Sequence, residues 1–284
     1  MDYSKYKISD LFYPGTPKTN SISIMKKRYI LEFQRRDKDG LPCFNHISQY
    51  IASKVYDILD IPCIKGDLGT FHGREVFVYK DILPLENTFV PYKDIAEQLM
   101  DKVENLSIYN IDNILDNISY TDGIQDNQYV YDTFFKMMVV DTILANEGRD
   151  MVSWGFFVND DRSYTLCPVF NNSFCLFSKA SEYDISKALC RKDLPRKYIY
   201  GVESSIGLTC EPIPFEELLK HKEYDELKDA IKYVIEKFNI KKVNKIIDNI
   251  KYISLDRKEF LKRVIEERLN LVRSIYKENY GETP

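Results

Sequence analysis

The sequence predicts a two-lobed α+β fold, with a small β-rich lobe over residues 1–85 and a larger helical lobe over residues 86–284. Two observations lead to this prediction. Strand-like alternation and clusters of turn residues dominate the chain up to about residue 80, and apolar residues at helical spacing dominate the rest. The length of 284 residues allows one large domain with a substantial core.

Residues 1–27 are rich in turn formers and show little periodicity, so no regular element is expected there. RYILEF (28–33) alternates as a strand does. The following segment, HISQYIASKVYDIL, predicts a helix over residues 46–59 because its apolar residues repeat every fourth position. That stripe consists of Ile47, Ile51, Val55 and Leu59.

Residues 61–82 predict two or three short strands of an antiparallel meander. The turn signals that would separate these strands are residues 65–67, Gly69 and residues 72–73. The first lobe is therefore expected to contain a strand, a helix and then this meander.

Helical periodicity begins near residue 92, in IAEQLMDKVENL, NIDNILDNI and NQYVYDTFFKMMVVDTILANE. The third segment predicts a long helix with Phe134, Met138 and Val139 inward. WGFFVNDDRSYTLCPVF predicts a hairpin that turns at residues 159–163. Two amphipathic helices are expected in the tail, over residues 215–238 and 256–277. Their buried faces would consist of Leu227, Ile231, Ile235, Leu261, Ile265, Leu269 and Val272.

Charge and cysteine usage exclude several classes of protein. The 40 Lys and Arg against 44 Asp and Glu leave a net charge of −4, whereas a dedicated nucleic-acid binder is usually strongly basic. The six cysteines are scattered and there are three histidines, so no metal site is expected. No local signature supports a Cys/His hydrolase. Without an apolar run of about 18 residues or a leader-like start, we expect a cytoplasmic protein with reduced thiols and no membrane contact.

Two stretches are locally basic, residues 26–28 and residues 239–252. Such runs are more often solvated surfaces than nucleic-acid contacts. Weak contact with an acidic partner is the alternative for the second stretch, which carries Lys241, Lys242, Lys245 and Lys251.

Five segments between residues 14 and 178 stand out together: YILEF, HISQYIASKVYDILDIP, LGTFHGREVFVYKDI, LANEGRDMVSWGFFVN and CPVFNNS. In this order they resemble the motifs of the HipA-like kinases, in particular the short single-chain, CtkA-type branch. The resemblance implies a bilobal protein-kinase-like fold, in which both lobes form one kinase-like domain.

In that family, Y-x-L-K-F carries a phosphate-binding lysine and S-E-Y-x-A its glutamate partner. The loop N-x-D-R-H-x-x-N-x-G carries a catalytic aspartate and a metal-binding asparagine, and P-I-F-D-N-G a metal-binding aspartate. This sequence places Glu32 at the lysine, Gln49 at the glutamate, Gly148 at the catalytic aspartate, Ser153 at the asparagine and Asn171 at the metal-binding aspartate. The implied catalytic site is therefore degenerate at every key position.

Two further positions follow from the same resemblance. Lys80 and Asp81 match the K-D pair at the link between the lobes, where adenine contacts are expected if a nucleotide binds. Residues 14–18 fall at the family's glycine-rich phosphate loop, but they contain one glycine and two prolines, which lack an amide donor. We interpret this stretch as a turn that leads into a strand.

Phosphoryl transfer depends on positioned charges: a lysine on the phosphates, metal ions held by Asp and Asn, and an aspartate that orients the nucleophile. Gly148 supplies none of these groups, and a positioned base contributes roughly 10²–10⁴-fold in rate. Glu32 would present a like charge to the phosphates. The amide of Asn171 carries no charge, so its hold on Mg²⁺ would be weak.

Two alternatives stay open from the sequence. Glu32 could be a solvated strand residue if the alignment is shifted by a few positions. Glu147 or Asp150 could take the place of the missing aspartate if the loop follows another path.

The sequence thus predicts a HipA-like pseudokinase that acts as a binding or regulatory protein. The resemblance implies a protein partner, in a toxin–antitoxin or defence context, with weak or no nucleotide binding and no cofactor. The alternative is an active Ser/Thr or Tyr kinase that uses Mg-ATP with rearranged residues. A pseudokinase that binds a nucleotide without metal is the third hypothesis.

Overall fold

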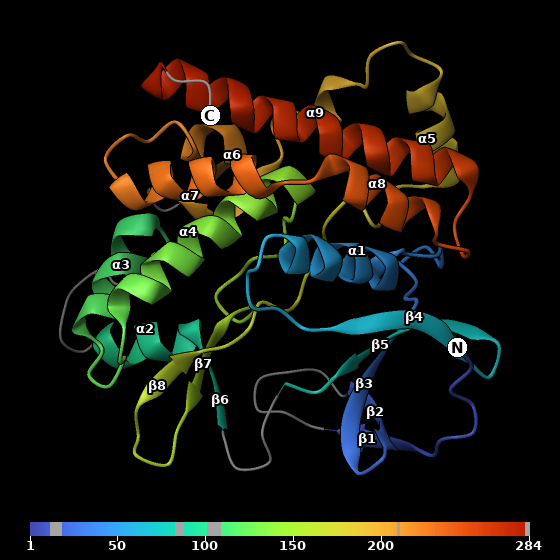
Figure 1. Ribbon diagram of the computed structural model, residues 1–284, viewed down its shortest axis with the longest axis horizontal. Coiled ribbons are helices and arrows are strands. Elements are labelled where there is room, and N and C mark those ends of the chain that lie inside the picture. Colours follow the sequence, from blue (N-terminus) through green and yellow to red (C-terminus); the bar gives the residue numbers. More distant parts are fainter. Residues whose placement is uncertain (12–18, 83–87, 101–108, 209–210, 282–284) are drawn as a thin grey trace.

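The fold is α+β and bilobal, as predicted, in a computed structural model that describes residues 1–11, 19–82, 88–100, 109–208 and 211–281. An antiparallel sheet forms the N-terminal part, and helices stack above and beside it to form the larger C-terminal part (Figure 1). The turn predicted at residues 14–18 lies outside the described residues.

The N-terminal sheet has five strands in the order β1-β2-β3-β5-β4. Their bounds are β1 Ile8–Leu11, β2 Thr19–Ile24, β3 Lys27–Phe33, β4 Gly66–Phe71 and β5 Arg74–Lys80. The prediction of no regular element before residue 28 was wrong, because β1 and β2 lie there. Both are short, and pairing with the neighbouring strand holds them: Asn20 of β2 lies opposite Leu31 of β3. The periodicity within one strand does not report such pairing.

The turns predicted at residues 65–67 and at Gly69 are also wrong, because Gly66 and Gly69 lie within β4. A Cβ on Gly66 would stand 2.3 Å from the carbonyl oxygen of Val78, and one on Gly69 would stand 2.4 Å from the carbonyl oxygen of Met1. These glycines therefore permit close backbone approach inside a strand. The turn predicted at His72 and Gly73 is confirmed, between β4 and β5.

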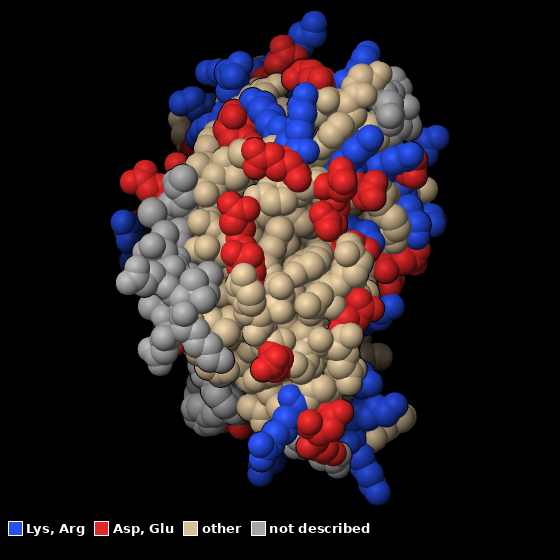
Figure 2. Space-filling view, turned by 90° about the vertical axis from the view of Figure 1, so that its left-hand side faces the viewer, with Lys and Arg blue, Asp and Glu red and all other residues tan. Residues whose placement is uncertain are grey.

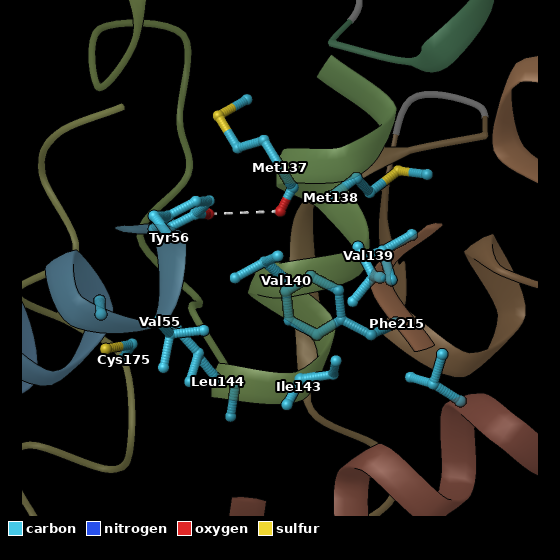
Figure 3. Packing of buried hydrophobic residues seen from close by; sticks show 14 of the residues in the cluster. Val55, Tyr56, Met137, Met138, Val139, Val140, Ile143, Leu144, Cys175 and Phe215 are labelled. Carbon is cyan, nitrogen blue, oxygen red and sulfur yellow. Dashed lines mark hydrogen bonds between the residues drawn. The ribbon is translucent and has the colours of Figure 1, made fainter. Parts of the chain in front are cut away.

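Helix α1 (Asn45–Ile58) lies between the sheet and the C-terminal helices. All four residues of its predicted stripe are buried. Figure 3 shows Val55 and Tyr56 of α1 facing Met137, Val140 and Leu144 of a long helix, α4. Helix α1 therefore belongs to the core of the C-terminal lobe, whereas the N-terminal sheet has a second cluster of its own, which consists of Tyr3, Ile22, Leu31, Phe71, Val76 and Val78.

The C-terminal part is built around α4 (Asn127–Leu144), which packs against α7 and α9. The other helices are α2 Tyr92–Met100, α3 Ile111–Tyr120, α5 Glu182–Leu189, η1 Arg196–Tyr198, α6 Phe215–Leu218, α7 Asp225–Lys237, α8 Ile240–Asp248 and α9 Leu255–Tyr280. Three strands form the sheet β6-β7-β8: β6 Thr88–Pro91, β7 Gly155–Val158 and β8 Tyr164–Leu166. Two more strands pair with each other: β9 Glu203–Gly207 and β10 Pro212–Pro214. Among the described helices, none is both long and apolar enough to cross a membrane.

The predicted helix over residues 215–238 is interrupted, with α6 and α7 on either side of residues 219–224. Helix α6 packs against β9, β10 and α9, whereas α7 packs mainly against α4 and also against α9. The break between them lets each helix turn its apolar face toward its own set of neighbours. The last part of the helix predicted from IAEQLMDKVENL, residues 101–106, lies outside the described residues.

Candidate functional site

Glu32 of β3 faces the segment 171–173 of the C-terminal lobe, and side chains from three segments contact its carboxylate. Its Oε1 atom accepts a hydrogen bond from Ser173 Oγ at 2.6 Å and from Asn45 Nδ2 at 3.0 Å. Arg35 Nη2 lies 3.8 Å away, as a longer ion pair. Only 11% of the Glu32 side chain is exposed. Glu32 is therefore tied to both lobes and is not a solvated strand residue.

Gln49 of α1 is buried and faces the same segment as Glu32. Its Oε1 atom accepts a hydrogen bond from the backbone N–H of Asn172, and Ser173 Oγ lies 3.4 Å from it. A hydroxyl has one proton to donate, so the shorter contact of Ser173, to Glu32, is its hydrogen bond. The segment 171–173 is thus tied to both β3 and α1.

Gly148 lies beneath the ring of Phe174. A Cβ on Gly148 would stand 2.7 Å from Cδ2 of Phe174 and 2.9 Å from its Cβ. Real Cβ atoms do not approach other carbon atoms this closely, so an aspartate does not fit at position 148 while Phe174 holds this place. The backbone N–H of Gly148 donates to Asn146 Oδ1 at 3.3 Å.

Arg149 is buried beside Gly148 and joins the loop 146–153 to the segment 170–172. It forms an ion pair with Asp141 of α4, with 2.7 Å from Nε to Oδ2, and both side chains are 1% exposed. Its guanidinium also donates to Asn172 Oδ1 at 2.5 Å and to the Phe170 carbonyl at 2.8 Å. Burial opposes a charged guanidinium, yet Asp141 holds the pKa of Arg149 above its usual range.

Ser153 and Asn171 stand at the two metal-binding positions that the resemblance implies. Ser153 is buried, and its hydroxyl donates to the Asp150 carbonyl at 2.8 Å, which closes a turn. Asn171 has a left-handed backbone with φ of 59°. Its neutral amide and the engaged hydroxyl of Ser153 do not supply the carboxylates that Mg²⁺ prefers. Within the described ranges, no three His, Cys, Asp or Glu side chains gather where they could hold a metal ion.

Of the two candidate substitutes for the missing aspartate, Asp150 caps its own turn, since its Oδ1 atom accepts from the Val152 N–H at 3.1 Å. Glu147 lines a pocket of about 310 Å³ together with Lys179 and Tyr198. Burial at this wall raises the pKa of Glu147, and the charges of Lys179 and Arg268 oppose part of that rise.

Lys80 and Asp81 lie at the end of β5. Asp81 forms an ion pair with Arg28 of β3, and its N–H donates to the Arg28 carbonyl at 3.0 Å. The Asp81 side chain is 5% exposed. This carboxylate is therefore used within the N-terminal sheet, and Lys80 is exposed beside it.

The structure thus brings most of the predicted site residues together. Glu32 and Gln49 contact the 171–173 segment directly. Gly148 is linked to this segment through Phe174. Ser153 is linked to it through Arg149, whose guanidinium donates to the Ser153 carbonyl at 3.3 Å. Lys80 and Asp81 contact other residues: the Lys80 N–H donates to the Lys65 carbonyl at 3.1 Å, and Asp81 pairs with Arg28.

Sequence reasoning missed the residues that make these connections: Asp141, Asn172, Ser173 and Phe174. Asp141 had a usable signal, because it is a lone carboxylate in the apolar run FFKMMVVDTIL. Arg149 also had a signal, because it matches the arginine of the loop pattern N-x-D-R-H-x-x-N-x-G. Ser173 and Phe174 offered no signal, since their partners are distant in sequence.

A bilobal kinase-like fold is the class of protein that this geometry defines. No protein-family model matches the chain. The chain is 25% identical over 235 residues, 80% of its length and 69% of the relative's, to the serine/threonine-protein kinase CtkA of Helicobacter pylori. It is therefore homologous to this HipA-like kinase, which confirms the predicted resemblance.

Two crystal structures support the fold. The H. pylori proinflammatory kinase CtkA superimposes with a TM-score of 0.86 at 21% identity, covering 98% of this chain and 99% of CtkA. HipA of Shewanella oneidensis, from a toxin–antitoxin complex with HipB and operator DNA, superimposes with a TM-score of 0.52 at 11% identity, covering 97% of this chain and 64% of HipA.

Proposed function

We propose that this protein is a HipA-like pseudokinase, a binding or regulatory protein that keeps the kinase fold without phosphoryl transfer. The observation that carries the proposal is the contact of Glu32 with Ser173: a carboxylate, hydrogen bonded to the segment 171–173, stands where the family has its phosphate-binding lysine.

The charge at position 32 argues against tight nucleotide binding. The interaction energy of two unit charges about 4 Å apart is on the order of 4 kcal/mol in a partly solvated site. A lysine attracts a phosphate by an amount of this order, whereas the Glu32 carboxylate repels it. The bonds from Asn45 and Ser173 hold the carboxylate in place, so it cannot simply turn away.

The loop around Gly148 argues against catalysis. Position 148 has no side chain, and Phe174 fills the space into which a base would project. The loss of a positioned base removes roughly 10²–10⁴-fold in rate. The side chains of Ser153 and Asn171 are neutral, so they would bind Mg²⁺ weakly, and this further lowers the expected rate of phosphoryl transfer.

Calorimetric titration of the full chain with ATP, with and without Mg²⁺, tests the proposal, with H. pylori CtkA as the positive control. We expect no Mg²⁺-dependent heat and no phosphate incorporation from labelled ATP. Mg²⁺-dependent binding together with autophosphorylation would contradict the proposal. Binding of ATP without metal would instead support the hypothesis of a pseudokinase that binds a nucleotide. In that case, Lys80 and Asp81 would be the first residues to substitute, because adenine contacts are expected there.

An active Ser/Thr or Tyr kinase that uses Mg-ATP is the second candidate. It is favoured by the homology to CtkA, a serine/threonine-protein kinase, and by Glu147, whose raised pKa and position at a pocket suit a base. Under this candidate, phosphate incorporation is present in the wild type and is lost in Glu147→Gln or Asp150→Asn.

The cellular setting that fits the proposal is a cytoplasmic toxin–antitoxin or defence system with a protein partner. It is supported by the fold shared with HipA, which occurs with HipB and operator DNA. Co-purification of the chain with the product of a neighbouring gene would test this setting, and recovery of the chain from a membrane fraction would contradict it.

A further inference from the structure

A strongly basic surface lies on the segment from the end of α5 to η1. Residues 187–197 hold five Lys or Arg and one acidic residue, Asp193, although the whole chain has a net charge of −4. The five basic residues, all exposed, are Lys187, Arg191, Lys192, Arg196 and Lys197. We call these five residues the basic patch.

The charges of the basic patch are not neutralised internally. In the described part of the chain, no carboxylate forms an ion pair with any of its five side chains. Acidic residues of α5 and α9 have partners elsewhere: Glu182 pairs with Arg257 at 2.7 Å, Asp184 accepts from Ser181 Oγ at 2.6 Å, and Asp256 accepts from Ser186 Oγ at 2.6 Å. The patch therefore presents a positive field to solvent.

The backbone under the patch is fixed. Arg263 of α9 donates to the Lys192 carbonyl at 2.6 Å, and Leu194 is buried beneath the turn. The guanidinium of Arg196 lies over the Tyr200 ring, with its Cζ atom 4.6 Å from the ring centroid. Because these charges sit on a held segment, they are pre-organised for a partner, which lowers the entropic cost of binding.

The patch continues into the pocket that contains Glu147. Lys197 belongs to both, and Tyr198, Phe174 and Phe177 line the same pocket of about 310 Å³. An aromatic-walled pocket next to a cationic surface suits an apolar side chain followed by carboxylates. In Figure 1 this region lies around α5, at the right-hand end of α9. The far side of the molecule differs, since Figure 2 shows acidic side chains scattered around a central region without charge.

We propose that the basic patch and this pocket together bind an acidic peptide segment of a partner protein, with an apolar side chain in the pocket and carboxylates on Arg191, Lys192 and Arg196. A protein segment is favoured over nucleic acid because a peptide can place an uncharged side chain beside Glu147 and Asp184 in the pocket and its carboxylates on the basic patch, whereas the phosphates of a nucleic acid recur at every nucleotide. The inference deepens the proposed function, on which it rests for the regulatory role of the bound partner.

Fluorescence anisotropy of the full chain tests the inference, with a labelled peptide of glutamates around one central phenylalanine. The test variant is Arg191→Glu, Lys192→Glu and Arg196→Glu, which leaves the backbone carbonyls under the patch in place. The matched control is Lys241→Glu, Lys242→Glu and Lys245→Glu on α8, where the same change in net charge is made on another exposed surface. Circular dichroism checks that both variants are folded.

We expect the patch variant to bind the peptide about tenfold more weakly, since three exposed charge pairs are lost, and the α8 variant to change affinity by less than about twofold. Replacing the central phenylalanine by alanine should also weaken binding. Equal losses in both variants, or no binding by the wild type at physiological salt, would overturn the inference. So would tighter binding of single-stranded DNA than of the peptide. The assay contains no nucleotide, so kinase activity would overturn the proposed function without affecting this result.

Discussion

Ser173 Oγ donates a hydrogen bond of 2.6 Å to Glu32 Oε1, across 141 positions of the chain. This contact joins the central strand of the N-terminal sheet to the segment that the resemblance aligns with the metal-binding aspartate of HipA-like kinases. In an active kinase, nucleotide phosphates and metal ions bridge these two places. Here the carboxylate of Glu32 and the hydroxyl of Ser173 link the two segments directly.

The charge of Glu32 predicts an order of ATP affinities. Glu32→Lys replaces repulsion of the phosphates by attraction, and Glu32→Gln removes the repulsion alone. Metal-free ATP should therefore bind most tightly to Glu32→Lys, then to Glu32→Gln, and least to the wild type, as measured by calorimetry. Equal affinities in all three would show that position 32 does not face the phosphates.

The same two variants predict an order of stabilities. Glu32→Lys leaves the donors Asn45 and Ser173 without their acceptor, which should lower the free energy of unfolding by about 1–3 kcal/mol. Glu32→Gln keeps an acceptor oxygen and should cost less. Urea unfolding monitored by tryptophan fluorescence measures both. A fully stable Glu32→Lys variant would contradict the importance of these bonds.

The approach of Phe174 to Gly148 predicts a coupled pair of substitutions. Gly148→Asp alone should lower stability by about 1–3 kcal/mol, because the new side chain meets the ring. Combined with Phe174→Ala, which opens the space, it should cost less than the sum of the single changes, by about 0.5–3 kcal/mol. A double-mutant cycle by denaturant unfolding checks this, and additive costs would argue against the contact.

The buried ion pair of Asp141 with Arg149 predicts a large loss on removal of one partner. Asp141→Ala should lower the free energy of unfolding by about 3–5 kcal/mol, since it leaves a buried guanidinium without its counter-charge. The exposed pair of Lys220 and Glu217 is the matched control, and Glu217→Ala should cost less than about 1 kcal/mol. Similar costs for both would mean that the Arg149 network is not a structural centre.

A variant that restores the family's residues should gain kinase chemistry. It combines Glu32→Lys, Gln49→Glu, Gly148→Asp, Ser153→Asn and Asn171→Asp with Phe174→Ala. We expect Mg²⁺-dependent ATP binding in this variant. Returning position 148 alone to glycine should then lower any phosphotransfer rate by roughly 10²–10⁴-fold. The readout is labelled phosphate incorporation, and Mg²⁺-independent binding in the full variant would contradict the assigned metal positions.

The strongly periodic elements could be predicted from the sequence, and the weakly periodic ones could not. The stripe of Ile47, Ile51, Val55 and Leu59 determines α1, because its burial depends on spacing within one helix. Strands β1 and β2 escaped prediction because their stability comes from neighbours in the sheet. Gly66 and Gly69 resembled turn residues, yet they mark close approach of two backbones.

For the site, the sequence by itself determined which chemical groups are missing, since Glu32, Gln49, Gly148, Ser153 and Asn171 follow from alignment to motifs. Only the tertiary structure decided what replaces them. The partners Ser173, Asn172 and Phe174 reach these positions across long stretches of chain, and a hydrogen bond or a steric contact depends on distances that no local pattern encodes. The changed residue types can be found in the sequence, whereas the contacts of Glu32 with Ser173 and of Gly148 with Phe174 depend on packing between distant segments.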